Sequence, residues 1–205
     1  MNYSELVTQI KNFVEDDSTE FEGSIDAIIA QVEEMIFQRA PNLPCYRGSS
    51  SSNTVKGTSS YTIATARMIR QLAITSSSNV VYLNHRIDSY LKDYWPNSAL
   101  EDQPEFYSTN SASVLGTVIT MAPTPDAVYP FTVDYIAPET GLSSGKTTTW
   151  ISNNAVNVLL SGCLYEASAF LKAPETLSLY KTQFDEAIAM LQEEMKRSYA
   201  AEYNG

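Results

Sequence analysis

The chain has 205 residues, of which 43% are hydrophobic and 11% aromatic, and its 24 acidic against 13 basic residues give a formal net charge of −11. This length suits one domain with a sizeable core, and the hydrophobic content can offset the entropy of ordering the chain, which excludes wholesale disorder. The acidic excess argues against a nucleic-acid reader and against binding to anionic membranes, because both depend on clustered Lys and Arg side chains.

The first part of the chain predicts two helices. Residues 3–39 contain one glycine and no proline, and their apolar residues recur every three to four positions, which is the helical period. Asn2 followed by Glu5 is typical of a capping box at a helix start. Residues 15–20 include four acids, which favours the start of a second helix near its positive dipole end. Pro41 then closes the helical region.

Residues 44–150 predict an inserted antiparallel β region, a sheet or a sandwich. Eight of the nine prolines fall between positions 41 and 138, and β-branched and aromatic residues alternate there with turn residues. The segments expected as strands are 61–66, 72–75, 80–83, 114–121 and 131–136.

Residues 48–60 have a composition of their own, with six Ser, two Thr and two Gly. Such a composition cannot fill a hydrophobic core, so it predicts a mobile loop or an exposed hairpin tip. A passive linker is the alternative interpretation.

The last part of the chain predicts a second helical pair within residues 151–201. Apolar stripes run through 156–171 and 177–195, and Pro174 between them suits the first position of a helix. The short connection makes the pair antiparallel. The predicted fold class is therefore α+β: a bundle of about four helices, formed by the N-terminal pair and the C-terminal antiparallel pair, with the β region inserted. Residues 1–205 are expected to form a single domain.

Charge is shared unevenly along the chain. Residues 1–40 carry a net −7, residues 41–150 carry −1 and residues 151–205 carry −3. The helices therefore either present a solvated acidic face or border an acidic channel.

The sequence offers little catalytic chemistry. His85 is the single histidine, and its neighbours give no recognisable nucleophile context, so we interpret it as a residue of a strand surface or a hydrogen-bonded core. Cys45 and Cys163 stand far apart without other ligand-type residues at metal spacing, which predicts two buried thiols and neither a disulfide nor a zinc site. The sequence has no basic and apolar leader and no long apolar run, and we expect a soluble protein of a reducing compartment.

Two short motifs invite a ligand interpretation. Residues 141–147, GLSSGKT, resemble a phosphate-binding loop, but the spacing is one residue short and residues 147–151 are expected to be extended, so a turn is favoured. The acidic residues 15–20 lack the alternating ligands and central glycine of a calcium loop. Carboxylate pairs for glycoside cleavage stay open, since their separation depends on the fold.

The order of several segments resembles one protein family. A Pro-aromatic segment at 104–107 leads to the apolar segment 114–121, then to Pro123 and Pro125 with one residue between them, and to a segment rich in Tyr at 129–135. The later part has Pro138, Gly141-Leu142-Ser143, the 147–150 stretch, and a helix bearing Leu159, Leu160, Glu166, Ala167, Phe170 and Leu171. With the two N-terminal helices, the Pro-rich β insertion and the C-terminal helical hairpin, this order resembles the head-to-tail adaptor proteins of tailed bacteriophages.

The resemblance implies a structural protein of the virion, assembled in the host bacterial cytoplasm. About twelve copies would form a ring that binds the portal above and a tail nozzle or tail tube protein below. It implies no enzymatic activity, catalytic residue, cofactor, metal or membrane partner, and DNA would cross the lumen only as passing cargo. A twelve-fold ring would carry a charge of about −130, and an acidic bore repels phosphate, which lets DNA slide.

The contacts within such an assembly are expected on surfaces that the helical stripes leave free. For the portal we predict the C-terminal residues Lys196, Arg197, Tyr199 and Tyr203, since Tyr and Arg combine apolar contact area with polar ends. Fraying of an exposed terminus is the competing interpretation. For a ring neighbour or a tail protein we predict the segment 48–60, with Gly48, Ser50, Asn53, Lys56 and Ser60.

Two functions from other classes remain open on sequence grounds. One is a virion-associated peptidoglycan hydrolase that uses two carboxylates. The other is a monomeric β-rich binding module joined to a helical bundle.

Overall fold

The computed structural model describes the backbone of residues 1–16, 18–111 and 116–203, and the side chains of residues 1–16, 18–110 and 116–197. The chain divides into two compact units. The helical unit comprises Met1–Tyr46 and Pro138–Gly205, and the β unit comprises Arg47–Ala137. The chain therefore passes from one unit to the other twice.

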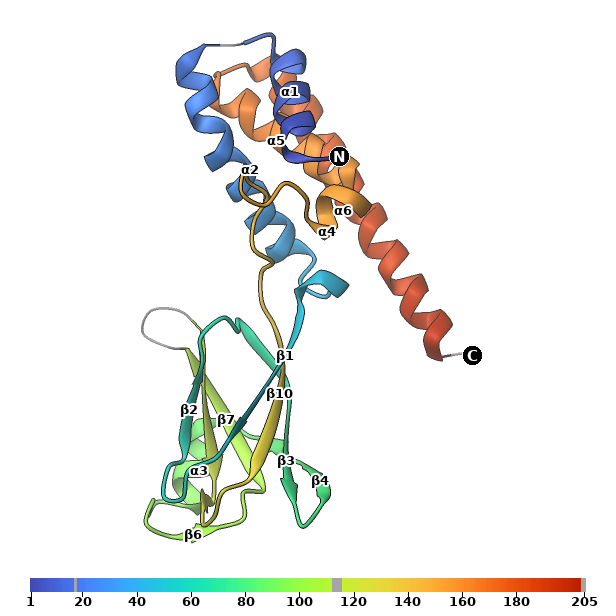
Figure 1. Cartoon of the computed structure of the whole chain (residues 1–205). Coiled ribbons are helices and arrows are strands. Elements are labelled where there is room, and N and C mark those ends of the chain that lie inside the picture. The colour runs from blue at the N-terminus through green and yellow to red at the C-terminus, as the bar shows by residue number, and fades with distance from the viewer. Residues whose placement is uncertain (17, 112–115, 204–205) are drawn as a thin grey trace. The chain divides into compact units, whose positions relative to one another are not determined.

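Five α-helices and one short 3-10 helix make up the described part of the helical unit (Figure 1). They are α1 (Tyr3–Val14), α2 (Thr19–Arg39), η1 (Pro44–Tyr46), α4 (Trp150–Asn154), α5 (Val156–Phe170) and α6 (Pro174–Tyr203). The predicted capping box of α1 is confirmed: the Asn2 Oδ1 atom accepts the Glu5 N–H, and the Glu5 Oε2 atom accepts the Asn2 N–H, both at 2.9 Å. Helix α6 begins at Pro174, as predicted.

Helix α5 is the centre of this unit, because it packs against α1, α2 and α6. Its pairing with α6 is antiparallel, as predicted. Thr176 near the start of α6 donates to the Ser168 hydroxyl near the end of α5 at 3.0 Å, whereas further along α6 the Phe184 ring stacks on Tyr165, with ring centroids 6.4 Å apart.

The closest approach of the helices lies at Gly162 in α5. A Cβ atom at this position would lie 2.6 Å from Val32 Cγ1 on α2 and 2.8 Å from Phe184 Cε2 on α6. Val32 and Phe184 are fully buried. The missing side chain of Gly162 thus lets three helices meet at one point of the core.

The described part of the β unit consists of two four-stranded sheets, a two-stranded pair and one helix. One sheet, sheet A, has the order β1-β10-β3-β4, and the other, sheet B, has the order β2-β8-β7-β5. The elements are β1 (Arg47–Asn53), β2 (Ser60–Ile63), β3 (Met68–Ser76), β4 (Asn79–Tyr82), β5 (Asn84–His85), α3 (Asp88–Tyr94), β6 (Glu101–Asp102), β7 (Phe106–Ser111), β8 (Thr117–Ala122), β9 (Thr124–Pro125) and β10 (Pro130–Ile136).

Side chains from both sheets share one hydrophobic core, which makes the β unit a sandwich. Sheet A contributes residues of β3 and β10, and sheet B contributes residues of β7 and β8, with Leu83 beside them. The buried cluster consists of Leu72, Ile74, Leu83, Tyr107, Ile119, Met121, Phe131 and Val133. The predicted β region and the α+β fold class are therefore confirmed.

Several expectations about single elements were wrong. Residues 48–53 are not a mobile loop: they belong to strand β1, which pairs with β10 from Arg47 to Asn53 in continuous register. A polar strand can form at a sheet edge, because backbone groups make the hydrogen bonds between the strands and only one face of the strand is covered by the core. Two pairings, β5 with β7 and β6 with β9, are parallel, where an antiparallel sheet was expected.

The number of helices also differs from the expected four or so, since the described residues include the short helices α3 and α4 as well. Residues 147–151 were expected to be extended, but α4 begins at Trp150. Thr149 caps it, accepting the Ser152 N–H at 3.1 Å while Ser152 Oγ accepts the Thr149 N–H at 2.8 Å. Of the expected strands, the part at 114–115 lies outside the described residues.

Candidate functional site

The residues that the sequence singles out for catalytic or metal-binding potential lie in different parts of the fold: His85 belongs to the β unit, whereas the acidic segment 15–20 and both cysteines belong to the helical unit. His85 is exposed on β5, as its interpretation as a strand-surface residue predicted, and a ring nitrogen lies 3.3 Å from Thr109 Oγ1. In the described ranges no three His, Cys, Asp or Glu side chains are grouped so that they could hold a metal ion. Within the acidic segment 15–20, Asp17 lies outside the described residues, and Asp16 accepts the Ser18 N–H at 2.8 Å.

The two cysteines are free thiols in the helical unit. Cys163 is fully buried in α5, which confirms the prediction for this residue, whereas Cys45 is half-buried. Burial raises the pKa of Cys45 to about 12, with Glu139 adding to the effect, and burial also raises the pKa of Cys163. Both thiols therefore stay protonated at neutral pH, and neither is an activated nucleophile.

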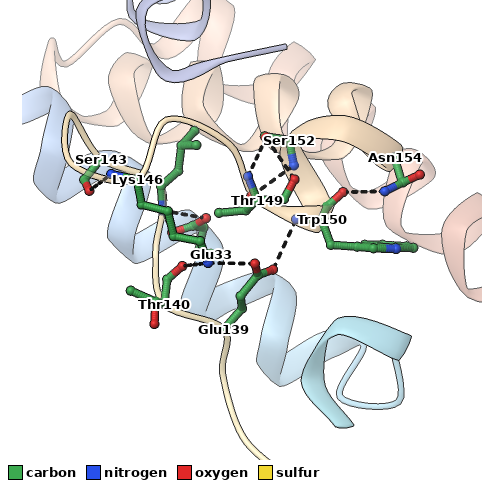
Figure 2. Close-up of polar contacts among 10 residues, drawn as sticks. Glu33, Glu139, Thr140, Ser143, Lys146, Thr149, Trp150, Ser152 and Asn154 are labelled. Carbon is green, nitrogen blue, oxygen red and sulfur yellow. Dashed lines mark hydrogen bonds and ion pairs between the residues drawn. The ribbon is translucent and has the colours of Figure 1, made fainter. Parts of the chain in front are cut away.

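The segment that resembles a phosphate-binding loop forms a closed set of internal contacts (Figure 2). The Lys146 ammonium donates to Glu139 Oε1 and to the Thr140 carbonyl, both at 2.7 Å. The other carboxylate oxygen of Glu139 accepts the Trp150 N–H at 3.2 Å. Since Lys146 is held by its own loop, the interpretation of this segment as a turn is favoured.

Three backbone N–H groups of this segment also form hydrogen bonds inside the protein. Glu33 of α2 accepts the Leu142 N–H with both carboxylate oxygens, at 3.0 and 3.1 Å. Ser143 and Lys146 bond to each other, the Ser143 N–H donating to the Lys146 carbonyl at 3.0 Å and the Lys146 N–H donating to Ser143 Oγ at 3.1 Å. Burial raises the pKa of Glu33 above its ordinary value, partly opposed by the Leu142 bond. These contacts fasten the segment to α2 and engage the N–H groups of Leu142, Ser143 and Lys146.

The residues predicted for a ring or tail contact do not form one loop. Gly48 and Ser50 lie half-buried in β1, and Asn53 is exposed at the end of that strand. Lys56 lies in the following turn, 3.4 Å from Glu101, and Ser60 begins β2 of the other sheet. The five residues are thus divided between the two sheets and the turn that joins them.

The residues predicted for the portal contact share the C-terminal part of α6. Lys196 and Arg197 are exposed, and Lys196 Nζ lies 2.6 Å from Glu193 Oε1. The backbone of Tyr199 and Tyr203 belongs to α6, but both side chains lie outside the described residues.

A groove of about 310 Å³ borders this part of α6. Gln192, Met195 and Lys196 line it from α6, and residues 39–43 line it from the end of α2. The two sides are joined by the Gln192 amide, which donates to the Arg39 carbonyl at 2.6 Å. The sequence analysis missed this groove, because it depends on two segments separated by about 150 residues along the chain.

A second surface that the sequence analysis missed is an aromatic cluster in the β unit. Tyr90, Tyr94 and Trp95 follow one another on and just after α3, and Phe106 of β7 lies beside them, with ring centroids of Trp95 and Phe106 5.3 Å apart. Arg86 Cζ lies 5.6 Å from the Tyr90 ring centroid and 5.7 Å from that of Phe106. Tyr94 is 66% exposed, so the cluster reaches the protein surface.

Comparison with known proteins decides the family. A family model described as SU10 adaptor protein matches residues 1–203. The chain belongs to this family. The adaptors of this family are phage head-tail adaptors, which confirms the resemblance drawn from the order of the sequence segments. A search of curated proteins found no match.

Family membership supports a head-tail adaptor role for this SU10 adaptor protein, and it implies a virion location and contacts with portal and tail proteins. It also suggests a non-enzymatic role. None of the helices in the described part of the adaptor has both the length and the apolar character needed to cross a bilayer. The surfaces with interaction potential in the adaptor are the end of α6 with its groove, the aromatic cluster of α3 and β7, and the strand β1.

Proposed function

We propose that copies of this adaptor form a ring of about twelve between the portal and the tail of a phage, and that DNA passes through the ring. The observation that carries the proposal is the match of the adaptor family model to residues 1–203. Within this proposal, residues 1–205 act as one adaptor domain, with the bundle of α1, α2, α5 and α6 and the inserted sandwich as its two parts.

The distribution of charge supports the passage of DNA. The helical unit carries 17 acidic and 7 basic residues, a net −10, whereas the β unit carries 7 and 6, a net −1. In the proposed ring the acidic helical units border the bore, because a negative wall repels phosphate and keeps DNA from adhering. A reconstruction of the assembled neck in which Lys and Arg line the bore would contradict this part of the proposal.

The C-terminal part of α6 is the proposed portal contact. Its groove offers apolar surface from the half-buried Pro41 and Met195, while Lys196 on its wall and Arg197, the next residue of α6, carry positive charge in a unit with a net charge of −10. A partly apolar recess with cationic neighbours suits a partner that inserts an apolar side chain beside a carboxylate. Tyr199 and Tyr203 continue the same helix.

The test of this contact compares wild-type adaptor with a chain that ends at residue 197. Native mass spectrometry of each chain, with and without purified portal protein, shows which multimers form. Titration with the portal protein gives the affinity. We expect the shortened chain to bind at least tenfold more weakly. Unchanged affinity would remove the assignment of Tyr199 and Tyr203, and a wild-type chain that forms no multimer with the portal would refute the proposed ring.

The aromatic cluster is the proposed contact for the tail protein. Tyr, Trp and Arg are the residues that most often carry the binding energy of interfaces, and here they already pack against one another, so little side-chain entropy is lost on binding. Tyr94→Ala is expected to lower the affinity of the tail protein for the portal-bound adaptor at least tenfold. Val128→Ala, which removes an equally exposed apolar side chain elsewhere in the β unit, is the matched control. Equal joining by the two variants would contradict this assignment.

A further inference from the structure

Sheet A of the β unit ends in two strands that pair on one side only. Strand β1 pairs with β10, and β4 pairs with β3, so that in the described part of the chain the outer sides of β1 and β4 have no neighbouring strand. In sheet B both edge strands are shorter than β1: β2 has four residues, as β4 has, and β5 has two. The seven-residue β1 is the longest of these edges.

The hydrogen bonds of the neighbouring residues show which backbone groups of β1 point outward. The Thr54 N–H donates to the Tyr129 carbonyl, and this pair continues the register of β1 with β10. Because residues of an antiparallel strand point their N–H and C=O groups alternately toward and away from the partner strand, Ser49, Ser51 and Asn53 direct theirs to the open side.

The same reasoning applies to β4. The Leu83 N–H donates to the Leu72 carbonyl and continues the register of β4 with β3, so Val80 and Tyr82 direct their backbone groups to the open side. Their side chains are 60% and 62% exposed. Each edge therefore offers alternate N–H and C=O groups to another strand.

Strand β1 lacks most of the features that prevent strand pairing between molecules, and β4 has one of them, its length of four residues. Proteins protect exposed edges with Lys, Pro, bulges or short strands. Apart from Arg47 at the start of β1, the edges are uncharged: residues 48–55 and 71–84 contain no charged residue and no proline, and the register of β1 shows no bulge.

The directions of the edges decide which strands fit together in a ring. All three pairings of sheet A are antiparallel, so β1 and β4 run in opposite directions. A second copy in the same orientation therefore brings its β4 antiparallel to β1 of the first copy. This contact is head-to-tail, the type that closes into a ring, whereas pairing of two β1 strands about a two-fold axis would give a closed dimer.

We propose that β1 of one copy pairs with β4 of the next copy in the adaptor ring, an inference that rests on the proposed function. Sheet A then continues from copy to copy, with Ser49, Ser51 and Asn53 facing Val80 and Tyr82 of the neighbour. Charge favours this location, because the β unit carries a net −1 and the helical unit a net −10, so copies that meet through their β units repel each other least.

The test is cysteine cross-linking in the portal-bound assembly. The double variant Ser51→Cys with Tyr82→Cys is mixed with portal protein, treated with a short bis-maleimide, and separated under denaturing conditions. We expect a ladder of covalent multimers up to the ring size. The two variants with one added cysteine each are the matched controls and are expected to give no ladder, since Cys163 is buried and Cys45 is half-buried in the helical unit.

A second variant tests the backbone bond itself. Ser51→Pro removes an N–H that points to the open side and leaves the ladder with β10 intact, whereas Ser51→Ala removes the hydroxyl and keeps the N–H. With equal helical content confirmed by circular dichroism, Ser51→Pro is expected to raise the concentration for half-maximal assembly on the portal about tenfold, and Ser51→Ala less than about twofold.

The outcomes separate this inference from the proposed function. If wild-type adaptor assembles on the portal but the double variant gives no ladder, or if Ser51→Pro assembles as well as Ser51→Ala, the strand pairing is refuted and the ring stands. If the wild-type adaptor forms no multimer with the portal, the proposed function is refuted, and the pairing of β1 with β4 is refuted with it.

Discussion

The substitution Gly162→Ala tests the contact of three helices in the helical unit. In a helix interior, Ala is favoured over Gly by about 1 kcal/mol. At Gly162 the new Cβ would lie 2.6 Å from Val32 Cγ1 and 2.8 Å from Phe184 Cε2. Overfilling a close-packed core costs about 2–3 kcal/mol at a site such as this one, where the β-branched Val32 has little rotamer freedom. We therefore expect a net loss of about 1–2 kcal/mol in the free energy of unfolding.

Gly23→Ala in α2 is the matched control, since a Cβ at Gly23 would meet no atom within 4 Å. This variant keeps the helix-propensity gain without the clash, and we expect it to stabilise the protein by about 1 kcal/mol. Urea unfolding followed by the helical circular dichroism signal measures both changes. If Gly162→Ala were stabilised as much as Gly23→Ala, then α2, α5 and α6 would not approach one another at Gly162, and the reasoning would be refuted.

Three further predictions concern single side chains. The pKa of Glu33 is raised in the folded state above its ordinary value of 4.5, so its contribution to stability is present below the unfolded pKa and is lost as pH rises through the folded pKa. Glu33→Gln should remove this pH dependence from urea midpoints measured across that range. An unchanged pH profile in the variant would contradict the prediction. Lys146→Met should lower the free energy of unfolding by about 1 kcal/mol in the same assay, because it leaves Glu139 without its ion pair. The control Lys181→Met, at an exposed lysine, should change this free energy by less than about 0.5 kcal/mol. Equal effects of the two substitutions would count against the contacts of Lys146. Gly116→Ala should destabilise the β unit by about 3 kcal/mol or more, because Gly116 has φ +96° and its Cβ would lie 2.3 Å from the Ile63 carbonyl oxygen; hydrogen exchange that stays slow in residues 47–137 would refute this.

Much of the helical unit could be predicted from the sequence because its signals are local. The capping box of Asn2 and Glu5 and the start of α6 at Pro174 involve residues within one helical turn. The apolar period likewise depends on neighbours three or four positions apart. The family could also be predicted, because the order of segments is read directly from the sequence and requires no knowledge of contacts.

The candidate site could be predicted only in part. The segment 48–60 and the end of α6 were found by composition, and their roles remain predictions. The groove beside α6 was missed, because it joins Gln192 to Arg39 across the chain. The aromatic cluster was missed because Phe106 reaches the rings of α3 from another strand, although the spacing of Tyr90, Tyr94 and Trp95 was a local signal.

The sequence by itself determined where α1 and α6 begin, how charge is divided and to which family the order of segments points. Only the tertiary structure decided that the serine-rich residues form strand β1, and that Glu33 holds the Leu142 amide 109 positions away. The physical reason is that a helix satisfies its own backbone hydrogen bonds, so its signal is carried by nearby residues. A strand or a turn of this kind takes its partners from distant segments, and their side chains do not specify the pairing locally.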